Sequence, residues 1–193
     1  FHASGGGYTE NSENVWDVYH PALRGVIDHD EKAPGYKWEK RLTPREIDAA
    51  LEAAGYNIGP LRTIALSRLA KPPVDAADRG VSGRLKYVKL TGGIGSVEIS
   101  GEKLRAILGL NSTLFDIKII FPAEKEIEFE ITDSYGERET KKIEIKAAPI
   151  PGQGYLADRP EIWRISGRTN ETVVFTGYGV GHGVGLSQWG AKA

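Results

Sequence analysis

The residues with the clearest chemical potential lie in the stretch 177–190, which reads GYGVGHGVGLSQWG. Its glycines alternate with apolar or aromatic residues and with His182, so a backbone that can reach positive φ is interleaved with an ionisable ring. Ser187 and Gln188 follow, and both can donate and accept hydrogen bonds without carrying charge. The pattern predicts a loop that makes close contact with a ligand or with another segment.

Two other interpretations apply to this stretch. A glycine-rich loop that runs into a helix can cradle a phosphate, but the lysine–hydroxyl pair of a P-loop is missing and no ribose-binding acid follows. Glycines that serve only tight turns stay an alternative. His182 could be a general base or a metal ligand; for a lone His in a glycine loop, hydrogen bonding to its neighbours or to a substrate is favoured.

The first 19 residues form the second candidate segment, rich in Gly and Ser and then polar. A run of three glycines at 5–7 offers no side-chain packing, which favours close approach of a partner. A surface loop with capping side chains is the alternative. Several side chains here could line a site: His2, Ser4, Tyr8, Thr9 and Glu10.

Four segments of the chain resemble, in the same order, segments of the stage II sporulation protein D family, which includes the amidase-enhancer proteins. The first is FHASGGGYTENSENVW at 1–16, and the last is GHGVGLSQWGA at 181–191. Between them lie SGR at 82–84 and LRAILGLNSTLF at 104–115.

The resemblance implies a peptidoglycan lytic transglycosylase that cleaves glycan strands stripped of their stem peptides. In such enzymes one carboxylic acid protonates the glycosidic oxygen and then, as the carboxylate, takes the proton of the muramic-acid C6 hydroxyl, which attacks to form an anhydro ring. The family's catalytic glutamate belongs to a segment before Phe1, and no Glu of this chain lies in a matching context. The expectation is a family-like domain over 1–193 that lacks its N-terminal catalytic segment.

The resembling segments also suggest which residues form the wall of the site. A neutral sugar polymer needs hydroxyl and amide groups more than charge, and Ser, Gln and neutral His provide these. No metal or other cofactor is expected, because the zinc site of some family members uses His and Cys, and one His without Cys does not make such a site. The expected substrate-binding residues are His2, Ser4, Arg84, His182, Ser187 and Gln188.

A function from another class stays open. The chain could be a non-catalytic glycan-binding module that enhances or recruits a cell-wall amidase, and the upstream glutamate is the feature that separates the two. Under either hypothesis the partners are peptidoglycan glycan strands, with an amidase as a further partner. The expected location is extracytoplasmic, in the cell envelope, and in a spore former at the sporulation septum.

Composition limits the other partners. The formal net charge of −1 gives no bulk electrostatic reason to bind nucleic acid or an anionic membrane. Cys is absent, so no disulfide framework exists. No apolar run approaches membrane-spanning length, and no signal peptide is present. Because the chain begins with Phe1 and contains no Met, it is expected to be the interior of a longer polypeptide, with any anchor before Phe1.

A charged run at 28–31, Asp-His-Asp-Glu, could be drawn as a metal cluster. Turn residues flank it and nothing in the sequence fixes its side chains on one face, so a solvated charged loop is favoured. Three aromatic residues are ambiguous, because aromatic faces stack on sugars as well as pack in cores: Trp16, Tyr36 and Trp38.

The remaining patterns predict an α+β fold, with β-rich mixed sheets, a few helices and an appended β-hairpin subdomain. A capping box at Thr43 predicts a helix that ends at Gly55, and Ser100 begins a second that ends at Gly109. The two chain ends are expected to lie together. Strands are predicted over 36–38, 62–69, 84–90, 97–99, 113–121, 162–165 and 173–175.

The strongest hairpin pattern spans 127–145, with a turn at 133–136, inside a proposed insertion at 122–160. Alternating apolar and charged residues predict one apolar face and one wet face. On the wet face, glutamates are expected to pair across the strands with lysines rather than act in catalysis. The residues concerned are Glu126, Glu128 and Glu130 on one strand and Lys141, Lys142 and Lys146 on the other.

Overall fold

The computed structural model describes residues 1–193 except 69–77, 121–126, 133–137, 144–160, 168–169 and 193. The fold is α+β and rich in strands, which confirms the predicted class. Every pairing between the described strands is antiparallel, and parallel pairing among the described residues is confined to single bridges. The helical elements are α1 (Glu13–Trp16), α2 (Pro44–Ala53), α3 (Gly101–Leu108) and the 3-10 turn η1 (Gly190–Lys192).

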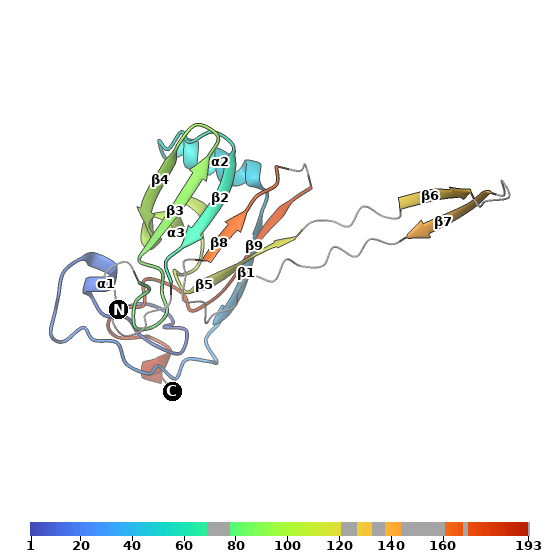
Figure 1. The fold of residues 1–193 in the computed structure, drawn as a ribbon. Helices are drawn as coiled ribbons and strands as arrows, with labels where there is room; N and C mark the ends of the chain where they lie inside the picture. Colours follow the sequence, from blue (N-terminus) through green and yellow to red (C-terminus); the bar gives the residue numbers. More distant parts are fainter. Residues whose placement is uncertain (69–77, 121–126, 133–137, 144–160, 168–169, 193) are drawn as a thin grey trace.

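One sheet contains four strands in the order β4-β3-β2-β8. Its register places Val88 opposite both Leu66 and Ile99, so buried apolar residues line up across the sheet. In Figure 1 this sheet forms the upper part of the body, with α2 beside it. Its strands are β2 (Leu61–Leu66), β3 (Tyr87–Gly92), β4 (Ser96–Ser100) and β8 (Glu161–Arg164).

The second sheet has three strands, with β9 between β1 and β5. Gly177 of β9 faces Trp38 on one side and Phe115 on the other. A methyl group at Gly177 would overlap the Trp38 ring, so glycine is required there. The strands are β1 (Lys37–Leu42), β5 (Phe115–Ile120) and β9 (Thr172–Tyr178).

Strands β6 (Ile127–Thr132) and β7 (Arg138–Ile143) pair with each other and confirm the predicted hairpin. In Figure 1 they lie apart from the two larger sheets. The register places Glu128 opposite Lys142, as predicted. The other described Glu and Lys residues are not paired as predicted, because Glu130 faces Thr140 and Lys141 faces Phe129. Glu126, Lys146, the turn at 133–136 and most of 122–160 lie outside the described residues, so the insertion's bounds stay a prediction.

The two predicted helices are confirmed, and their ends follow local chemistry. Thr43 caps α2, since its hydroxyl accepts the Glu46 N–H at 3.3 Å and Glu46 accepts the Thr43 N–H at 2.7 Å. Ser100 caps α3 by accepting the Lys103 N–H at 3.2 Å, and Gly109 ends it with φ +60°. No described helix has the length and apolar character needed to span a membrane.

The predicted strand over 84–90 begins later, at Tyr87. The residues before it form a tight turn, in which Gly80 N–H donates to Arg84 C=O at 2.9 Å and Gly83 N–H donates to Gly80 C=O at 2.9 Å. Arg84 therefore leaves the sheet, and its side chain turns inward.

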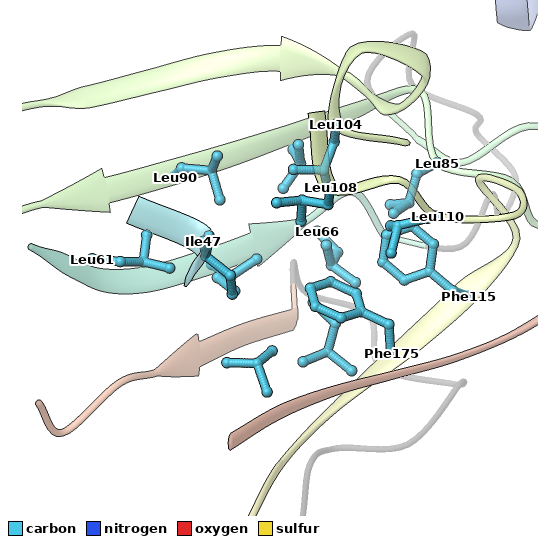
Figure 2. Packing of buried hydrophobic residues seen from close by; sticks show 14 of the residues in the cluster. Ile47, Leu61, Leu66, Leu85, Leu90, Leu104, Leu108, Leu110, Phe115 and Phe175 are labelled. Atoms are coloured by element: carbon cyan, nitrogen blue, oxygen red, sulfur yellow. The ribbon is translucent and has the colours of Figure 1, made fainter. Parts of the chain in front are cut away.

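The hydrophobic core fills the space between the sheets and the helices (Figure 2). Phe115 and Phe175 meet edge to face with ring centroids 5.5 Å apart. Trp38 is buried and tilts against Phe115 at 6.2 Å, so it is a core residue. Helix α2 contributes Ile47 and Leu51, which are both fully buried. The core is thus the product of the apolar periodicities of the strands and of α2.

Candidate functional site

The two ends of the chain lie side by side, as predicted, and form what we call the terminal seam: residues 2–10 against residues 178–190. The His2 N–H donates to Leu186 C=O at 3.1 Å, and the Glu10 N–H donates to Gly183 C=O at 2.7 Å. Figure 1 places both termini in this part of the molecule, below the four-stranded sheet. Three single-residue bridges join the segments: His2 with Ser187, Ser4 with Val180, and Glu10 with Val184.

Arg84 is the buried centre of the seam, with 1% of its surface exposed. Its Nη2 donates to Gly5 C=O at 2.8 Å and its Nη1 donates to Gly181 C=O at 3.3 Å. A side chain at Gly183 would overlap the guanidinium, so glycine provides its space. Burial lowers the pKa of Arg84 to about 10, although Glu10 favours the charged form, and Arg84 stays charged at neutral pH. One cation thus joins three of the four segments that resemble the sporulation family.

The fourth segment meets the seam at the same place. Asn111 C=O accepts the Gly181 N–H at 2.8 Å, and the Ser112 hydroxyl donates to Tyr178 C=O at 2.6 Å. Ser112 is fully buried. The segments at 1–16, 82–84 and 104–115 therefore all contact residues 178–181, the backbone that leads into the segment at 181–191.

Glu10 is fully buried and holds the 80–82 turn against the seam. One of its carboxylate oxygens accepts from Val81 N–H at 3.1 Å, Asn11 N–H at 2.8 Å and the Asn14 amide at 2.7 Å. The other accepts from Ser82 N–H at 3.0 Å and the Ser82 hydroxyl at 2.5 Å. The sequence placed Glu10 among residues that could line a site, whereas in the structure all its acceptor capacity is used internally.

Two further carboxylates, Asp28 and Asp30, hold the glycine run 5–7. Asp30 accepts from the Ser4 hydroxyl, and the two aspartates together accept the three backbone N–H groups of the run at 2.9 to 3.1 Å. Glycines allow this because their bare backbone brings successive N–H groups close to one acceptor.

These contacts correct the prediction of a solvated charged loop at 28–31. His29 and Glu31 are exposed, but Asp28 and Asp30 are buried, with 6% and 1% of their surfaces exposed. The physical reason is that the N–H groups of this buried and half-buried glycine run need acceptors, and carboxylates from a neighbouring segment supply them. The triple glycine was the signal that could have suggested such acceptors.

The two aspartates differ in acidity. Burial raises the pKa of the Asp30 carboxyl, but the hydrogen bonds from Ser4 and the glycine N–H groups outweigh it and hold that pKa below its ordinary value. Burial and the neighbouring Asp30 raise the pKa of Asp28, while hydrogen bonds from Ser187 and from Gly5 N–H partly offset the rise. Of the two carboxyl groups, Asp30 is therefore the stronger acid and Asp28 the weaker.

The structure brings the six predicted site residues together but does not open all of them to solvent. Ser4 and Arg84 make the internal contacts above, and Ser187 accepts the Gly190 N–H at 3.0 Å at the start of η1. Their role in binding a substrate stays a prediction. His2, Ser4, Arg84 and Ser187 are buried, His182 is half-buried, and Gln188 is exposed.

The two histidines of the seam are fixed by Val184. His2 Nδ1 donates to Val184 C=O at 3.2 Å, and His182 Nδ1 accepts the Val184 N–H at 3.0 Å. Burial, with smaller contributions from Arg84 and His182, lowers the pKa of His2 to about 4 despite its bond to Val184. Burial also lowers the pKa of His182, and a hydrogen bond to the Phe1 backbone partly offsets this. Both rings are neutral at pH 7, and His182 is used for positioning rather than free as a base.

Aromatic rings, by contrast, reach the surface of the seam. Trp16 of α1 is 46% exposed, and its ring lies 5.1 Å from that of His182. Tyr36 and Tyr178 meet edge to face at 5.6 Å, and Tyr178 is 37% exposed. Trp16 and Tyr178 are therefore open to solvent, Tyr36 is half-buried, and Trp38 is buried.

Within the described residues, no three His, Asp or Glu side chains are arranged to hold a metal ion. No model of a known protein family matches this chain, and no curated protein matches it either.

Proposed function

We propose that this chain is the glycan-binding part of a peptidoglycan lytic transglycosylase of the sporulation or cell-envelope machinery. The main support is that the four segments resembling that family, far apart in the sequence, lie together at the seam: Arg84 joins three of them, and the 104–115 segment contacts residues 178–181. Segments that resemble a family only by chance have no reason to meet in one part of the fold.

The surface of the seam supports a neutral sugar polymer as the ligand. Trp16 and Tyr178 are 46% and 37% exposed, and aromatic side chains are residues on which pyranose rings stack. Gln188 lies in the same segment of the seam as Tyr178 and is exposed, and its side-chain amide offers both a donor and an acceptor. The net charge of −1 gives no electrostatic preference for a polyanion.

The general acid of the proposed reaction would come from a segment that precedes Phe1, as the resemblance implies. Glu10 and Asp30 do not suit the role, because both are buried and already accept several hydrogen bonds from the protein. An acid that must reach a glycosidic oxygen needs access to the substrate.

One observation favours a second function, that of a non-catalytic module that binds glycan and enhances or recruits a cell-wall amidase. Glu10 in the seam and the neighbouring Asp28 and Asp30 accept hydrogen bonds from backbone N–H groups, so these carboxylates fix the shape of the backbone rather than transfer protons. In either function the protein would work outside the cytoplasm, in the cell envelope.

Incubation with glycan strands stripped of stem peptides tests the proposal. Co-sedimentation measures binding, and mass spectrometry of the soluble fraction detects anhydro-muramic products. For the polypeptide that carries the upstream segment we expect binding and product. Binding without product, together with faster release of stem peptides by an added amidase, would support the second function. Absence of binding would contradict both.

The Trp16→Ala variant tests whether the glycan binds at the seam. Loss of one stacking ring should weaken binding about tenfold, equivalent to ~1.4 kcal/mol. Ile94→Ala is the matched control, because Ile94 is 73% exposed in the turn between β3 and β4, outside the seam. Equal binding by the two variants would show that the ligand does not contact Trp16.

A further inference from the structure

Two tyrosines form an aromatic surface where β1 begins and β9 ends. Tyr178 is the last residue of β9, Tyr36 directly precedes β1, and their rings meet edge to face at 5.6 Å. The backbone of Tyr178 is fixed, because its N–H donates to Leu114 C=O at 3.0 Å and its C=O accepts the Ser112 hydroxyl at 2.6 Å. With 37% of its surface exposed, Tyr178 is a fixed aromatic residue that a ligand can reach.

Lys37 adds a positive charge beside Tyr178. The register of β1 and β9 places the two residues directly opposite each other. Directly opposite residues of an antiparallel pair project from the same face of the sheet, with Cβ atoms about 5 Å apart. Trp38, the next residue along β1, is buried in the core, so Lys37 and Tyr178 lie on the outer face of the sheet. Lys37 is exposed there.

The charge of Lys37 is not used by the described part of the chain, in which Lys37 forms no ion pair. Glu39, on the same face of β1, pairs with Arg41 at 2.7 Å instead. A lysine ammonium on its flexible stem can therefore turn toward an anion of a ligand. The formal net charge of −1 gives no long-range attraction for anions, so any such preference is local to this surface.

The Tyr36 hydroxyl supplies a neutral donor next to this charge. It has no hydrogen-bond partner among the described residues and is not fully buried. Burial, with the nearby charges of Asp30 and Glu31, raises the pKa of Tyr36, so the hydroxyl keeps its proton at neutral pH. Among the described residues other than its chain neighbours, a Cβ at Gly7 would meet only this hydroxyl oxygen, at 3.2 Å. The space beside the hydroxyl is therefore open.

The ligand of the proposed function carries an anion at one defined place. When an amidase removes a stem peptide, water hydrolyses the amide bond that joins the peptide to the lactyl group of muramic acid. The peptide leaves with a free amine, and the lactyl group keeps a carboxylate, which is ionised at neutral pH. A strand that still carries its stem peptides has a neutral amide at this position. One cation beside a sugar-binding ring therefore distinguishes the two kinds of strand.

We propose that Lys37, the Tyr36 hydroxyl and the Tyr178 ring form a subsite for the lactyl carboxylate of stripped muramic acid. The inference rests on the proposed glycan-binding function and adds to it the residue that selects stripped strands. Lys37 binds the carboxylate, the Tyr36 hydroxyl donates a second hydrogen bond to it, and the sugar ring lies against Tyr178. An amide at the same position has no charge for Lys37 to bind.

The test compares two ligands that differ in this one group. One is the stripped glycan strand, and the other is the same strand with its lactyl carboxylates converted to neutral methylamides. Co-sedimentation of the full polypeptide over a range of strand concentrations, with incubations too short for cleavage, measures both affinities. The unmodified protein should bind the stripped strand about fivefold more tightly than the amidated strand, as expected for one charge-assisted contact at an exposed site.

Four variants assign the preference to the subsite. Lys37→Gln should weaken binding of the stripped strand about fivefold and leave binding of the amidated strand unchanged. Lys37→Arg keeps the charge and should keep the preference. Tyr36→Phe removes the second donor, so about threefold weaker binding of the stripped strand is expected. Lys89→Gln, at an exposed position of β3 in the four-stranded sheet, is the matched control and should bind both strands as the unmodified protein does.

The outcomes separate this inference from the proposed function. If the unmodified protein binds both strands equally, or if Lys37→Gln keeps the preference, the subsite is overturned while glycan binding stands. If Lys89→Gln loses the preference as Lys37→Gln does, the selection comes from the overall charge of the protein, and the subsite is again overturned. If the unmodified protein binds neither strand, both ideas fail.

Discussion

The hydrophobic core and the terminal seam are held together by different forces. In the core, fully buried side chains such as Phe115, Phe175 and Leu66 gain stability from the apolar surface that they remove from water. In the seam, Arg84 and Glu10 are as deeply buried, yet their contacts are hydrogen bonds to backbone groups or to short polar side chains.

The two regions differ in how many kinds of side chain each can accept at a given position. Apolar packing is not directional, so a core tolerates other apolar residues of similar volume. Hydrogen bonds to buried backbone groups are directional and costly to leave unmade, so one missing atom in the seam matters. A site built on such contacts has its backbone fixed before any ligand arrives.

The largest expected effect is in the core. Phe175→Ala should lower the free energy of unfolding by about 4 kcal/mol, because it removes a fully buried ring and leaves a cavity. Urea unfolding followed by circular dichroism measures this. Phe175→Leu should cost only about 1 kcal/mol. If the leucine variant lost as much as the alanine variant, the core would be as demanding of shape as the seam, and the comparison would break.

A glycine pair sharpens the comparison in the seam. Gly183→Ala should cost about 3 kcal/mol, because the residue has φ +77° and the added methyl overlaps Arg84. Gly55→Ala is the matched control, since Gly55 has φ +87° but open space around it, and about 1 kcal/mol is expected. Equal losses in the two variants would mean that Arg84 can move aside and that the seam is looser than its contacts suggest.

Much of the core region could be predicted from the sequence because its signals are local. The capping box at Thr43 predicted the start of α2, and the apolar residues at 173–175 predicted β9. The predicted end of α3 at Gly109 is confirmed by its positive φ. Each of these signals lies within a few residues of the element that it predicts.

The seam was predicted only in part, because its partners lie far apart in the sequence. The resemblance pointed to Arg84 and His182, and the structure brings both into the seam. It did not predict that Arg84 would be buried, or that Asp28 and Asp30 would reach the glycine run. No periodicity links a carboxylate to a backbone N–H more than 20 residues away, so composition alone favoured a solvated loop there.

The Glu10→Gln variant tests how much the charge of one buried carboxylate in the seam contributes to stability. The variant keeps the shape but replaces an acceptor oxygen with a donor that must face the N–H groups of Val81 or Ser82. A loss of about 2 kcal/mol in the free energy of unfolding is expected.

The control for this substitution is Glu46→Gln, which changes the exposed capping box of α2 and should cost about 0.5 kcal/mol. Thermal unfolding of both variants in parallel gives the comparison. A Glu10→Gln protein as stable as Glu46→Gln would show that the buried carboxylate contributes shape and not charge.

The smallest expected effect is a pH dependence that only the seam should produce. The pKa of His2 falls from 6.5 to about 4 on folding, so the unfolded chain binds a proton more readily than the folded one. This contribution is present above pH 6.5 and is lost as the pH falls toward 4, which corresponds to about 1 kcal/mol between pH 7 and pH 5.5. His182 acts in the same direction, because burial lowers its pKa too. His2→Gln should therefore reduce the change of the urea midpoint between these pH values and leave the part that His182 contributes, whereas His29→Gln, at an exposed position, should leave the slope unchanged. If His29→Gln removed the slope instead, the pH dependence would not arise in the seam, and the difference between the two regions would rest on hydrogen bonding alone.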